Sequence, residues 1–134
     1  MTSELVLFYQ DDFCRIEYDQ ANKVVISTRN GYPSDEKLKK SLNQSLACIQ
    51  KYKCPNIISD TRKVKGTWTS ANEWIAKDWF PRAIQAGLKN IAFIYPPDIF
   101  GQFALQDLIK KTPHYTSQVF KDMPSAESWI KSVQ

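Results

Sequence analysis

Hydrophobic and polar residues alternate near the start of the chain in the pattern of half-buried β-strands. Three short segments have this character, at residues 5–9, 13–18 and 23–28. In the second segment, Cys14, Ile16 and Tyr18 fall on one side of the strand. The charged Arg15 and Glu17 fall on the other side. Because only short turns separate the three segments, we expect them to pair as an antiparallel meander.

From residue 34 onward, the spacing of hydrophobic residues changes to that of amphipathic helices separated by short apolar runs. The runs at residues 56–60, 89–95 and 117–121 are expected to be strands. Helices are expected after four residues whose side chains can cap them, Ser34, Ser70, Asp98 and Asp122. Strands that alternate with helices indicate parallel strands joined by right-handed crossovers. We therefore predict one α/β domain spanning residues 1–134, in which a mixed sheet of about six strands, an antiparallel meander followed by parallel β-α units, packs with about four helices.

Each expected helix has one apolar face. The first helix is expected to bury Leu38, Leu42, Leu46 and Ile49. In the second, Ser70 and Glu73 match a capping box. Pro81 is expected to kink or restart that helix, because proline has no amide hydrogen to donate. The apolar stripe of the third helix is expected to consist of Phe100, Phe103, Ala104, Leu108 and Ile109.

Composition supports a folded domain and narrows the classes of function. The 134 residues are 43% hydrophobic and 13% aromatic, which is typical of globular proteins and not of disordered chains. The formal net charge of +4 is small beside the basic footprint of a dedicated nucleic-acid-binding protein. The sequence shows neither a membrane span nor the pattern of a signal peptide. The three cysteines have no paired spacing, so we expect reduced thiols in a cytoplasmic protein.

No arrangement of residues in the sequence predicts a catalytic centre, a metal site or a cofactor. His114 is the only histidine, and it follows Pro113 in an expected loop, so a surface histidine is the simpler interpretation. Cys54 follows Lys51 and Lys53, which makes it the better candidate for a redox-sensitive thiol. The alternative is that the cysteines are small buried hydrophobic residues. We expect a protein that is not an enzyme and that holds no metal or cofactor.

Four segments lie in an order and spacing that resemble a known family. They are the strand Asn56–Asp60, a Trp74-containing helix ending near Phe80-Pro81, the run Ala86–Ala92, and Val119-Phe120 followed by Ala126 and Trp129-Ile130. On these segments, and over nearly its whole length, the chain resembles the STAS-type, SpoIIAA-like family. Within that family it is most similar to the small bacterial stand-alone proteins described as STAS/SEC14-like. The resemblance implies a regulatory or protein-interaction module rather than an enzyme.

The segment after Asp60 departs from this family at a functionally important point. Anti-anti-sigma members carry an Asp-Ser-Ser/Thr-Gly phosphorylation motif there, whereas this chain reads DTRKVKGTWTS over residues 60–70. Thr67, Thr69 and Ser70 lie near the equivalent position, and Ser70 is explained as a helix cap. Because the motif is missing, we do not expect phosphorylation at these three residues.

Asp60, Arg62, Trp68 and Trp74 form the candidate site for a ligand or partner. Asp60 is expected to end a buried strand, at the sheet edge where open α/β sheets bind ligands. Its alternative role is to accept hydrogen bonds from backbone amides of its own loop. Aromatic and arginine side chains gathered at a loop rim are typical of interface anchors. Core filling is the alternative interpretation of Trp74.

Three functions follow from these observations. The first is a non-enzymatic regulatory or protein-interaction module with an unidentified protein partner. The second is a binder of a small apolar ligand or lipid, as SEC14-like relatives imply. The third and least favoured is weak nucleic-acid binding through Arg62, Lys63, Lys65 and Trp68. The apolar segment Leu5–Tyr9 also favours a homodimer, because an exposed sheet edge invites pairing.

Overall fold

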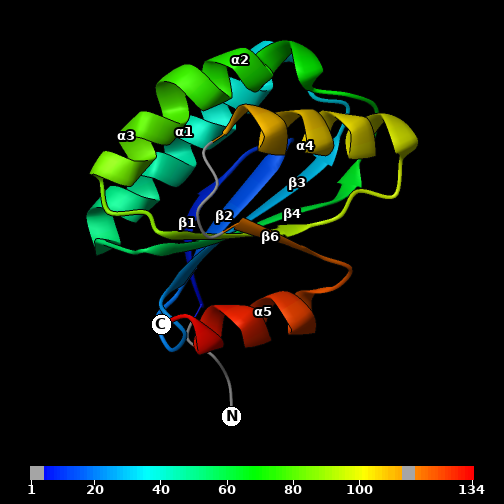
Figure 1. Cartoon of the computed structure of the whole chain (residues 1–134). Helices are drawn as coiled ribbons and strands as arrows, with labels where there is room; N and C mark the ends of the chain where they lie inside the picture. Colours follow the sequence, from blue (N-terminus) through cyan, green and yellow to red (C-terminus); the bar gives the residue numbers. More distant parts are fainter. Residues whose placement is uncertain (1–4, 113–116) are drawn as a thin grey trace.

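The computed structural model describes residues 5–112 and 117–134, which form a six-stranded sheet with flanking helices (Figure 1). Its strands are β1 (Leu5–Gln10), β2 (Cys14–Asp19), β3 (Val24–Gly31), β4 (Asn56–Val64), β5 (Asn90–Ile94) and β6 (Ser117–Phe120). They lie side by side in chain order, with β1 at one edge and β6 at the other. β1, β2 and β3 pair antiparallel, whereas β3 to β6 pair parallel. The predicted α/β class and the mixed sheet are confirmed.

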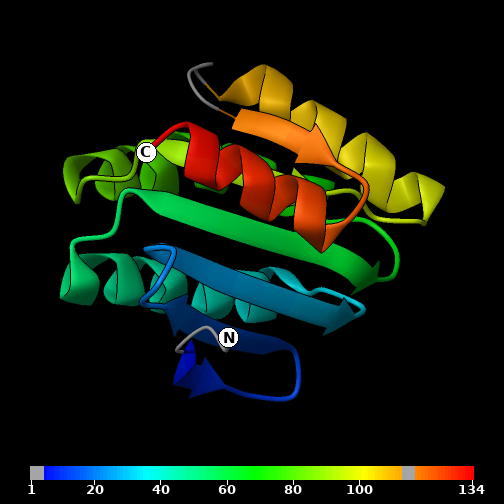
Figure 2. The ribbon, with the colours of Figure 1, turned by 90° about the horizontal axis from the view of Figure 1, so that it is seen from below.

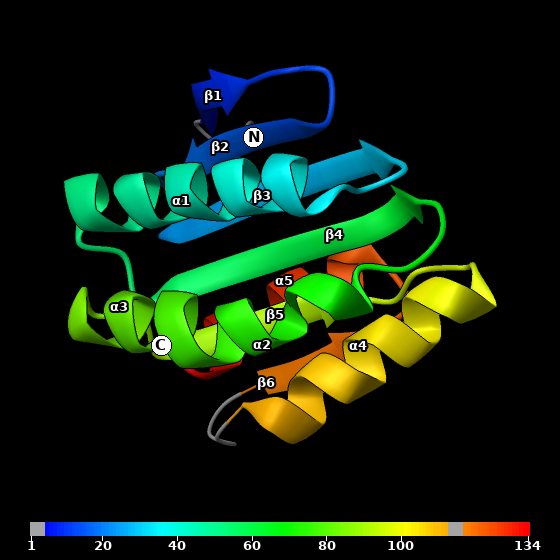
Figure 3. The same cartoon turned by 90° about the horizontal axis from the view of Figure 1, so that it is seen from above.

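The helices form two unequal layers on the faces of this sheet. They are α1 (Asp35–Tyr52), the 3-10 helix η1 (Thr69–Ala71), α2 (Asn72–Trp74), the π-helix η2 (Ile75–Trp79), α3 (Phe80–Gln85), α4 (Ile99–Lys111) and α5 (Met123–Ser132). The elements from α1 to α4 cover one face, as Figure 3 shows, and α5 lies on the opposite face (Figure 1). Parallel strands that succeed one another in one direction place their crossovers on the same face, because these crossovers share one hand.

Each face of the sheet has its own hydrophobic core, because successive residues of a strand point to opposite faces. In β4, Ile57 belongs to the larger core under α1 to α4, and Ile58 belongs to the smaller core under α5. α5 contributes Ala126 and Ile130 to the smaller core. It packs on β4, β5 and β6, and no helix of residues 5–112 and 117–134 covers β1 and β2 on that face (Figure 2).

Three of the four expected helix caps are confirmed, since Ser34, Asp98 and Asp122 accept hydrogen bonds from amides in the first turns of α1, α4 and α5.

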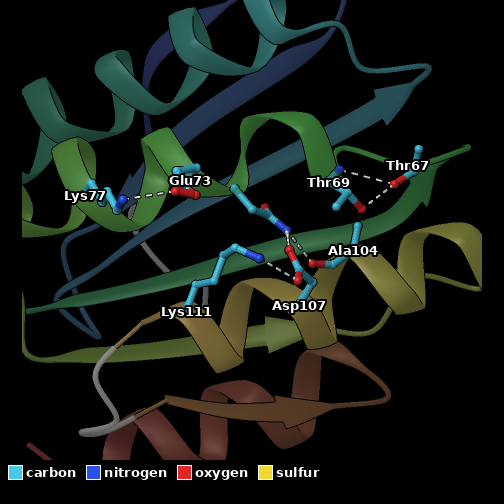
Figure 4. Close-up of polar contacts among 8 residues, drawn as sticks. Thr67, Thr69, Glu73, Lys77, Ala104, Asp107 and Lys111 are labelled. Atoms are coloured by element: carbon cyan, nitrogen blue, oxygen red, sulfur yellow. Dashed lines mark hydrogen bonds and ion pairs between the residues drawn. The ribbon is translucent and has the colours of Figure 1, made fainter.

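The fourth expected cap, Ser70, is wrong. Ser70 lies inside η1, and its hydroxyl donates to the Asp35 carboxylate at 2.6 Å. A capping residue needs a non-helical backbone, which a position within a 3-10 helix does not provide. The expected partner in the capping box, Glu73, instead pairs with Lys77 at 3.0 Å (Figure 4).

A π-helical turn accommodates Pro81. α2, η2 and α3 follow one another without a break from Asn72 to Gln85. Within η2, the amide of Phe80 donates to the carbonyl of Ile75, five residues earlier. In an α-helix, a proline ring clashes with the carbonyl four residues before it, and the wider turn relieves this clash. Pro81 therefore coincides with a change of helix type, and the helix does not restart there, which was one of the two expected effects.

α4 buries only part of the predicted apolar stripe, because Ala104 and Leu108 are buried but the two phenylalanines are not. Phe100 and Phe103 are 61% and 60% exposed, whereas Gly101 is buried. A side chain at position 101 would come within 3.0 Å of Pro96, so glycine lets this face of the helix approach the preceding loop. The side-chain amide of Asn72 in α2 also donates to the carbonyl of Ala104 in α4 at 2.8 Å. These contacts set the rotation of α4 and turn both phenylalanines outward.

Candidate functional site

β4 continues beyond Asp60 to Val64, so the prediction that the strand ends at Asp60 is wrong. The extension is held by parallel pairing with the end of β3, where Gly31 pairs with Val64. Asp60 accepts hydrogen bonds from the backbone amide of Arg62 at 3.1 Å and from its guanidinium at 3.0 and 2.8 Å. It therefore bonds to its own segment, which is the alternative role given to it above.

Asp60 and Arg62 lie on the face of the sheet that α5 covers. Because β4 alternates, Asp60 shares this face with Ile58, which belongs to the smaller core. Hydrogen bonding to Asp60 raises the pKa of Arg62, and the nearby carboxylate of Asp122 at the start of α5 adds to this effect. The pair therefore lies near the start of α5.

The two tryptophans of the predicted site lie in the opposite layer. Trp68 is buried in the larger core. Trp74 is half-buried, and the charged groups of Lys39 and Arg82 lie 5.3 and 5.8 Å from the centre of its ring. The four predicted site residues are therefore not brought together around one ligand. Burial of Trp68 also leaves it little surface on which a nucleic-acid base could stack.

The hydroxyls of Thr67, Thr69 and Ser70 are exposed and take part in hydrogen bonds. The hydroxyls of Thr67 and Thr69 lie 2.8 Å apart, and the amide of Thr69 donates to the Thr67 hydroxyl at 3.2 Å (Figure 4). Ser70 bonds to Asp35 at the start of α1. Side-chain bonds of this kind shape a local turn, here the entry into η1.

A cavity lies inside the larger core, between the sheet and the helices α1 to α4. This core cavity is lined by Phe13, Arg29, Pro33, Leu38, Leu42, Ile57, Ser59, Thr61, Val64, Trp68, Ile75, Trp79, Phe80, Ile91, Phe93 and Leu108. Protein atoms leave a volume of about 640 Å³ unfilled there, and this volume includes adjoining solvent. The smaller volume that is open to the centre of a water molecule is about 60 Å³. A single water molecule needs about 10–15 Å³ of this smaller volume. The core cavity therefore has room for a small molecule.

Two local irregularities shape the core cavity. A bulge gives β4 one extra residue relative to β3, and both Thr61 and Val64 line the cavity as a result. On the opposite wall, the π-turn places Ile75 and Trp79 in the lining. The indole N–H of Trp79 donates to the carbonyl of Leu42 at 2.7 Å, which ties this helix to α1. π-Turns are frequent at functional sites, and this one builds a wall of the cavity.

Arg29, from β3, places a positive charge in the wall of the core cavity. The residue is 4% exposed. Its Nε donates to the hydroxyl of Ser41 at 2.9 Å, and its Nη1 donates to the hydroxyl of Ser59 at 3.2 Å. Its Nη2 is buried and has no hydrogen-bond partner among the described residues. Burial lowers the pKa of the guanidinium, but arginine stays protonated in proteins.

Ser41 of α1 and Ser59 of β4 hold Arg29 by accepting hydrogen bonds from it. The hydroxyl of Ser41 donates to the carbonyl of Leu38 at 2.9 Å, so its oxygen is oriented to accept from Arg29. One turn further along α1, the hydroxyls of Ser45 and Ser27 lie 2.8 Å apart. Polar groups held in this way in a low-dielectric interior are fixed in position, which makes the guanidinium a rigid element of the cavity wall.

The sequence analysis did not identify Arg29, because the expected strand ended at residue 28. A signal was nevertheless present. Val25, Ser27 and Arg29 are spaced by two, which places the arginine on the buried face once the strand is extended. Ser41 and Ser45 lie within the predicted apolar face of the first helix, where hydroxyls need partners. Together these patterns indicate a buried polar contact between that strand and that helix.

The three cysteines are buried and not disulfide-bonded. Burial raises the pKa of each thiol, to about 12 for Cys48. The sulfur of Cys54 lies 3.2 Å from the carbonyl oxygens of both Lys23 and Asn56. A buried, protonated thiol is unreactive. These positions match the small buried residues given as the alternative to a redox sensor.

The remaining features considered in the sequence are the histidine, a metal site and a membrane-spanning helix. His114, together with Pro113, lies outside the described residues. Within residues 5–112 and 117–134, no group of three or more His, Cys, Asp or Glu side chains is arranged to hold a metal ion. In the same part of the chain, no helix combines the length and apolar character needed to cross a membrane.

Comparisons of this chain with models of protein families, with curated proteins and with solved structures find no match. The resemblance to the STAS-type family therefore stays a prediction, as does the absence of enzyme activity.

Proposed function

We propose that this protein binds a small apolar molecule in the core cavity. The supporting observation is the lining of the cavity, in which leucine, isoleucine, phenylalanine and tryptophan side chains predominate and few polar groups occur. Sites for small organic molecules have this composition. Ser59, in a central strand, is only half-buried because it faces the cavity. The proposal corresponds to the apolar-ligand alternative drawn from the sequence.

Titration with hexan-1-ol, a neutral apolar probe, tests this proposal. We expect saturable binding of one molecule per chain by isothermal titration calorimetry. Ile75→Phe fills the cavity with a larger side chain, and we expect it to weaken binding by at least about tenfold, equivalent to about 1.4 kcal/mol. Ile84→Phe is the matched control, because the same change falls on a 40% exposed residue of α3 that does not line the cavity.

The control variant should bind hexan-1-ol as the unmodified protein does. Circular dichroism and thermal unfolding of both variants will establish that they are folded. Equal binding of hexan-1-ol by Ile75→Phe and Ile84→Phe would contradict the proposal. So would a failure of the unmodified protein to bind either hexan-1-ol or hexanoate, its charged counterpart of the same chain length. Native mass spectrometry of freshly purified protein gives an independent check, since a ligand carried through purification adds a reproducible mass.

A second candidate function is interaction with a second copy of the chain through β1, in line with the interaction module implied by the family resemblance. It is supported by the position of β1 at the edge of the sheet, where its outer backbone groups are available for pairing. Leu5 and Leu7 of this strand are 48% and 51% exposed. Two identical strands can pair antiparallel about a twofold axis, which makes a second copy the simplest partner.

A further inference from the structure

Arg29 has no counterion among the described residues. The ion pairs in this part of the chain join other side chains, and none of them includes Arg29. Its neighbour across the strand pair is Cys14 of β2. Burial raises the pKa of that thiol, so it stays neutral and does not balance the charge. The wall of the core cavity therefore carries a positive charge that these residues leave unpaired, and a buried unpaired charge is strongly unfavourable.

Two hydrogen-bond donors at this point have no acceptor among the described residues. The first is Nη2 of Arg29, which is buried and without a partner in the described structure. The second is the hydroxyl of Ser59, which accepts from Arg29 and donates to none of the described residues. The hydroxyl of Thr61, by contrast, already donates to the carbonyl of Ile94 at 2.6 Å. A guanidinium N–H and a neighbouring hydroxyl thus lie together on one wall of an otherwise apolar cavity.

This donor set suits a single carboxylate group. Guanidinium and carboxylate groups form short, charge-assisted hydrogen bonds, and these are stronger than bonds between neutral groups. One positive charge balances one carboxylate, whereas a phosphate carries up to two charges and needs more donors than this wall supplies. The remaining lining is apolar and would contact the rest of the ligand.

We infer that the ligand of the core cavity is a small monocarboxylic acid with an apolar body, whose carboxylate pairs with Arg29 and accepts from Ser59. This inference rests on the proposed function, because it specifies the chemistry of the ligand that the cavity binds. The carboxylate would satisfy Nη2 of Arg29 and neutralise the buried charge. Short-chain fatty acids belong to this chemical class.

Paired titrations with hexanoate and hexan-1-ol test the inference, because the two probes have chains of the same length and differ in charge. We expect the unmodified protein to bind hexanoate at least about tenfold more tightly than hexan-1-ol, since hydrogen bonds to charged groups are the stronger ones. Arg29→Met should lose this preference and still bind hexan-1-ol. Arg15→Met is the control, because Arg15 lies on the opposite side of β2 and pairs with Glu17 at 3.3 Å.

The outcomes separate the inference from the proposed function. Binding of hexan-1-ol without preference for hexanoate would overturn the inference and leave the proposed function standing. If neither probe binds to the unmodified protein, both are overturned. An unchanged preference in Arg29→Met would also overturn the inference. Should Arg29→Met fail to fold, Ser59→Ala provides the second test, since it should weaken binding of hexanoate several-fold and leave hexan-1-ol unaffected.

Thermal unfolding tests the role of Arg29 both without ligand and with hexanoate. A buried charge without a partner destabilises the folded state, and an apolar residue of similar length removes that penalty. Arg29→Met should therefore unfold at a temperature equal to or above that of the unmodified protein. Added hexanoate should raise the unfolding temperature of the unmodified protein and leave that of the variant unchanged. Equal shifts in both proteins would contradict a role for Arg29 in recognising the carboxylate.

Discussion

At the scale of single residues, Asp11 shows how one carboxylate organises the turn between β1 and β2. It accepts hydrogen bonds from the hydroxyl of Tyr9 at 2.6 Å and from the amides of Phe13 and Cys14, both at 2.8 Å. Burial raises the pKa of Asp11, but these hydrogen bonds outweigh it and leave the pKa below its usual value. The same contact raises the pKa of Tyr9 to about 12.

The Tyr9–Asp11 hydrogen bond predicts a dependence of stability on alkaline pH. The pKa of Tyr9 is higher in the folded chain than its usual value of 10.0, so the bond stabilises the fold below pH 10.0. This contribution is lost as the pH rises from there to about 12. We expect Asp11→Asn to lower the pKa of Tyr9 towards its usual value.

The absorbance of tyrosinate measures this pKa. Subtracting the titration of Tyr9→Phe from that of the unmodified protein isolates Tyr9 from the other tyrosines. The same subtraction in the Asp11→Asn background gives the shifted value. A Tyr9 pKa that is the same in the Asp11→Asn variant as in the unmodified protein would show that the hydrogen bond is not its cause.

At the scale of elements, the starts of helices differ in how they are held. Ser34 has an extended backbone and accepts from the amide of Lys37 at 3.2 Å, as a capping residue does. Ser70 has the same side chain and precedes another helical segment, yet it lies within η1 and bonds to Asp35 instead. The type of residue is the same at both positions, and the backbone conformation decides which one caps a helix.

Alanine substitutions at the two serines should separate these roles. We expect Ser34→Ala to lower the free energy of unfolding by about 1 kcal/mol, because an amide in the first turn of α1 loses its acceptor. Ser70→Ala removes an exposed hydroxyl, and its effect should stay within about 0.5 kcal/mol. Urea unfolding followed by circular dichroism measures both. If the two variants were destabilised equally, the capping assignment would have to be reversed or abandoned.

At the scale of the whole molecule, the two faces of the sheet are covered unequally. The helices from α1 to α4 cover one face, whereas α5 covers only part of the other (Figure 2). β1 lies at the edge beside the part that α5 leaves uncovered. Leu7 of β1 pairs with Glu17, which lies opposite the buried face of β2, so Leu7 points towards this uncovered side.

This exposed edge predicts self-association. We expect sedimentation velocity to show a dimer at high protein concentration. Leu7→Lys should shift the population to monomer, because a charged side chain on an edge strand opposes pairing with another copy. Ile84→Lys, which places the same charge on a 40% exposed residue of α3, should sediment as the unmodified protein does. A monomer at every concentration would contradict association through β1.

The order and type of the elements could be predicted from the sequence because their signals are local. The alternation of Cys14, Ile16 and Tyr18 correctly predicted the buried side of β2, and Ser34 correctly predicted the start of α1. Each of these patterns depends on residues within one strand or one helical turn. Chain order then implied the parallel strands, since short apolar runs alternate with helices.

The length of β4 and the rotation of α4 depend on contacts with residues that are distant in the sequence. β4 reaches Val64 because β3 pairs with it, and no signal within β4 requires this. Phe100 and Phe103 are exposed although Ala104 and Leu108 of the same predicted stripe are buried, because Gly101 packs closely on Pro96 and sets the rotation of α4. The sequence patterns at these positions were compatible with more than one packing arrangement.

The sequence by itself therefore determined the fold class, whereas only the tertiary structure decided the candidate site. Arg29, Ser41 and Ser59 come from β3, α1 and β4, and they meet only when the sheet and the helical layer pack together. The cavity beside them depends on a bulge and a π-turn that are held by contacts between elements. Periodicity reports which face of one element is buried, and it carries no information about which residues of other elements share that interior.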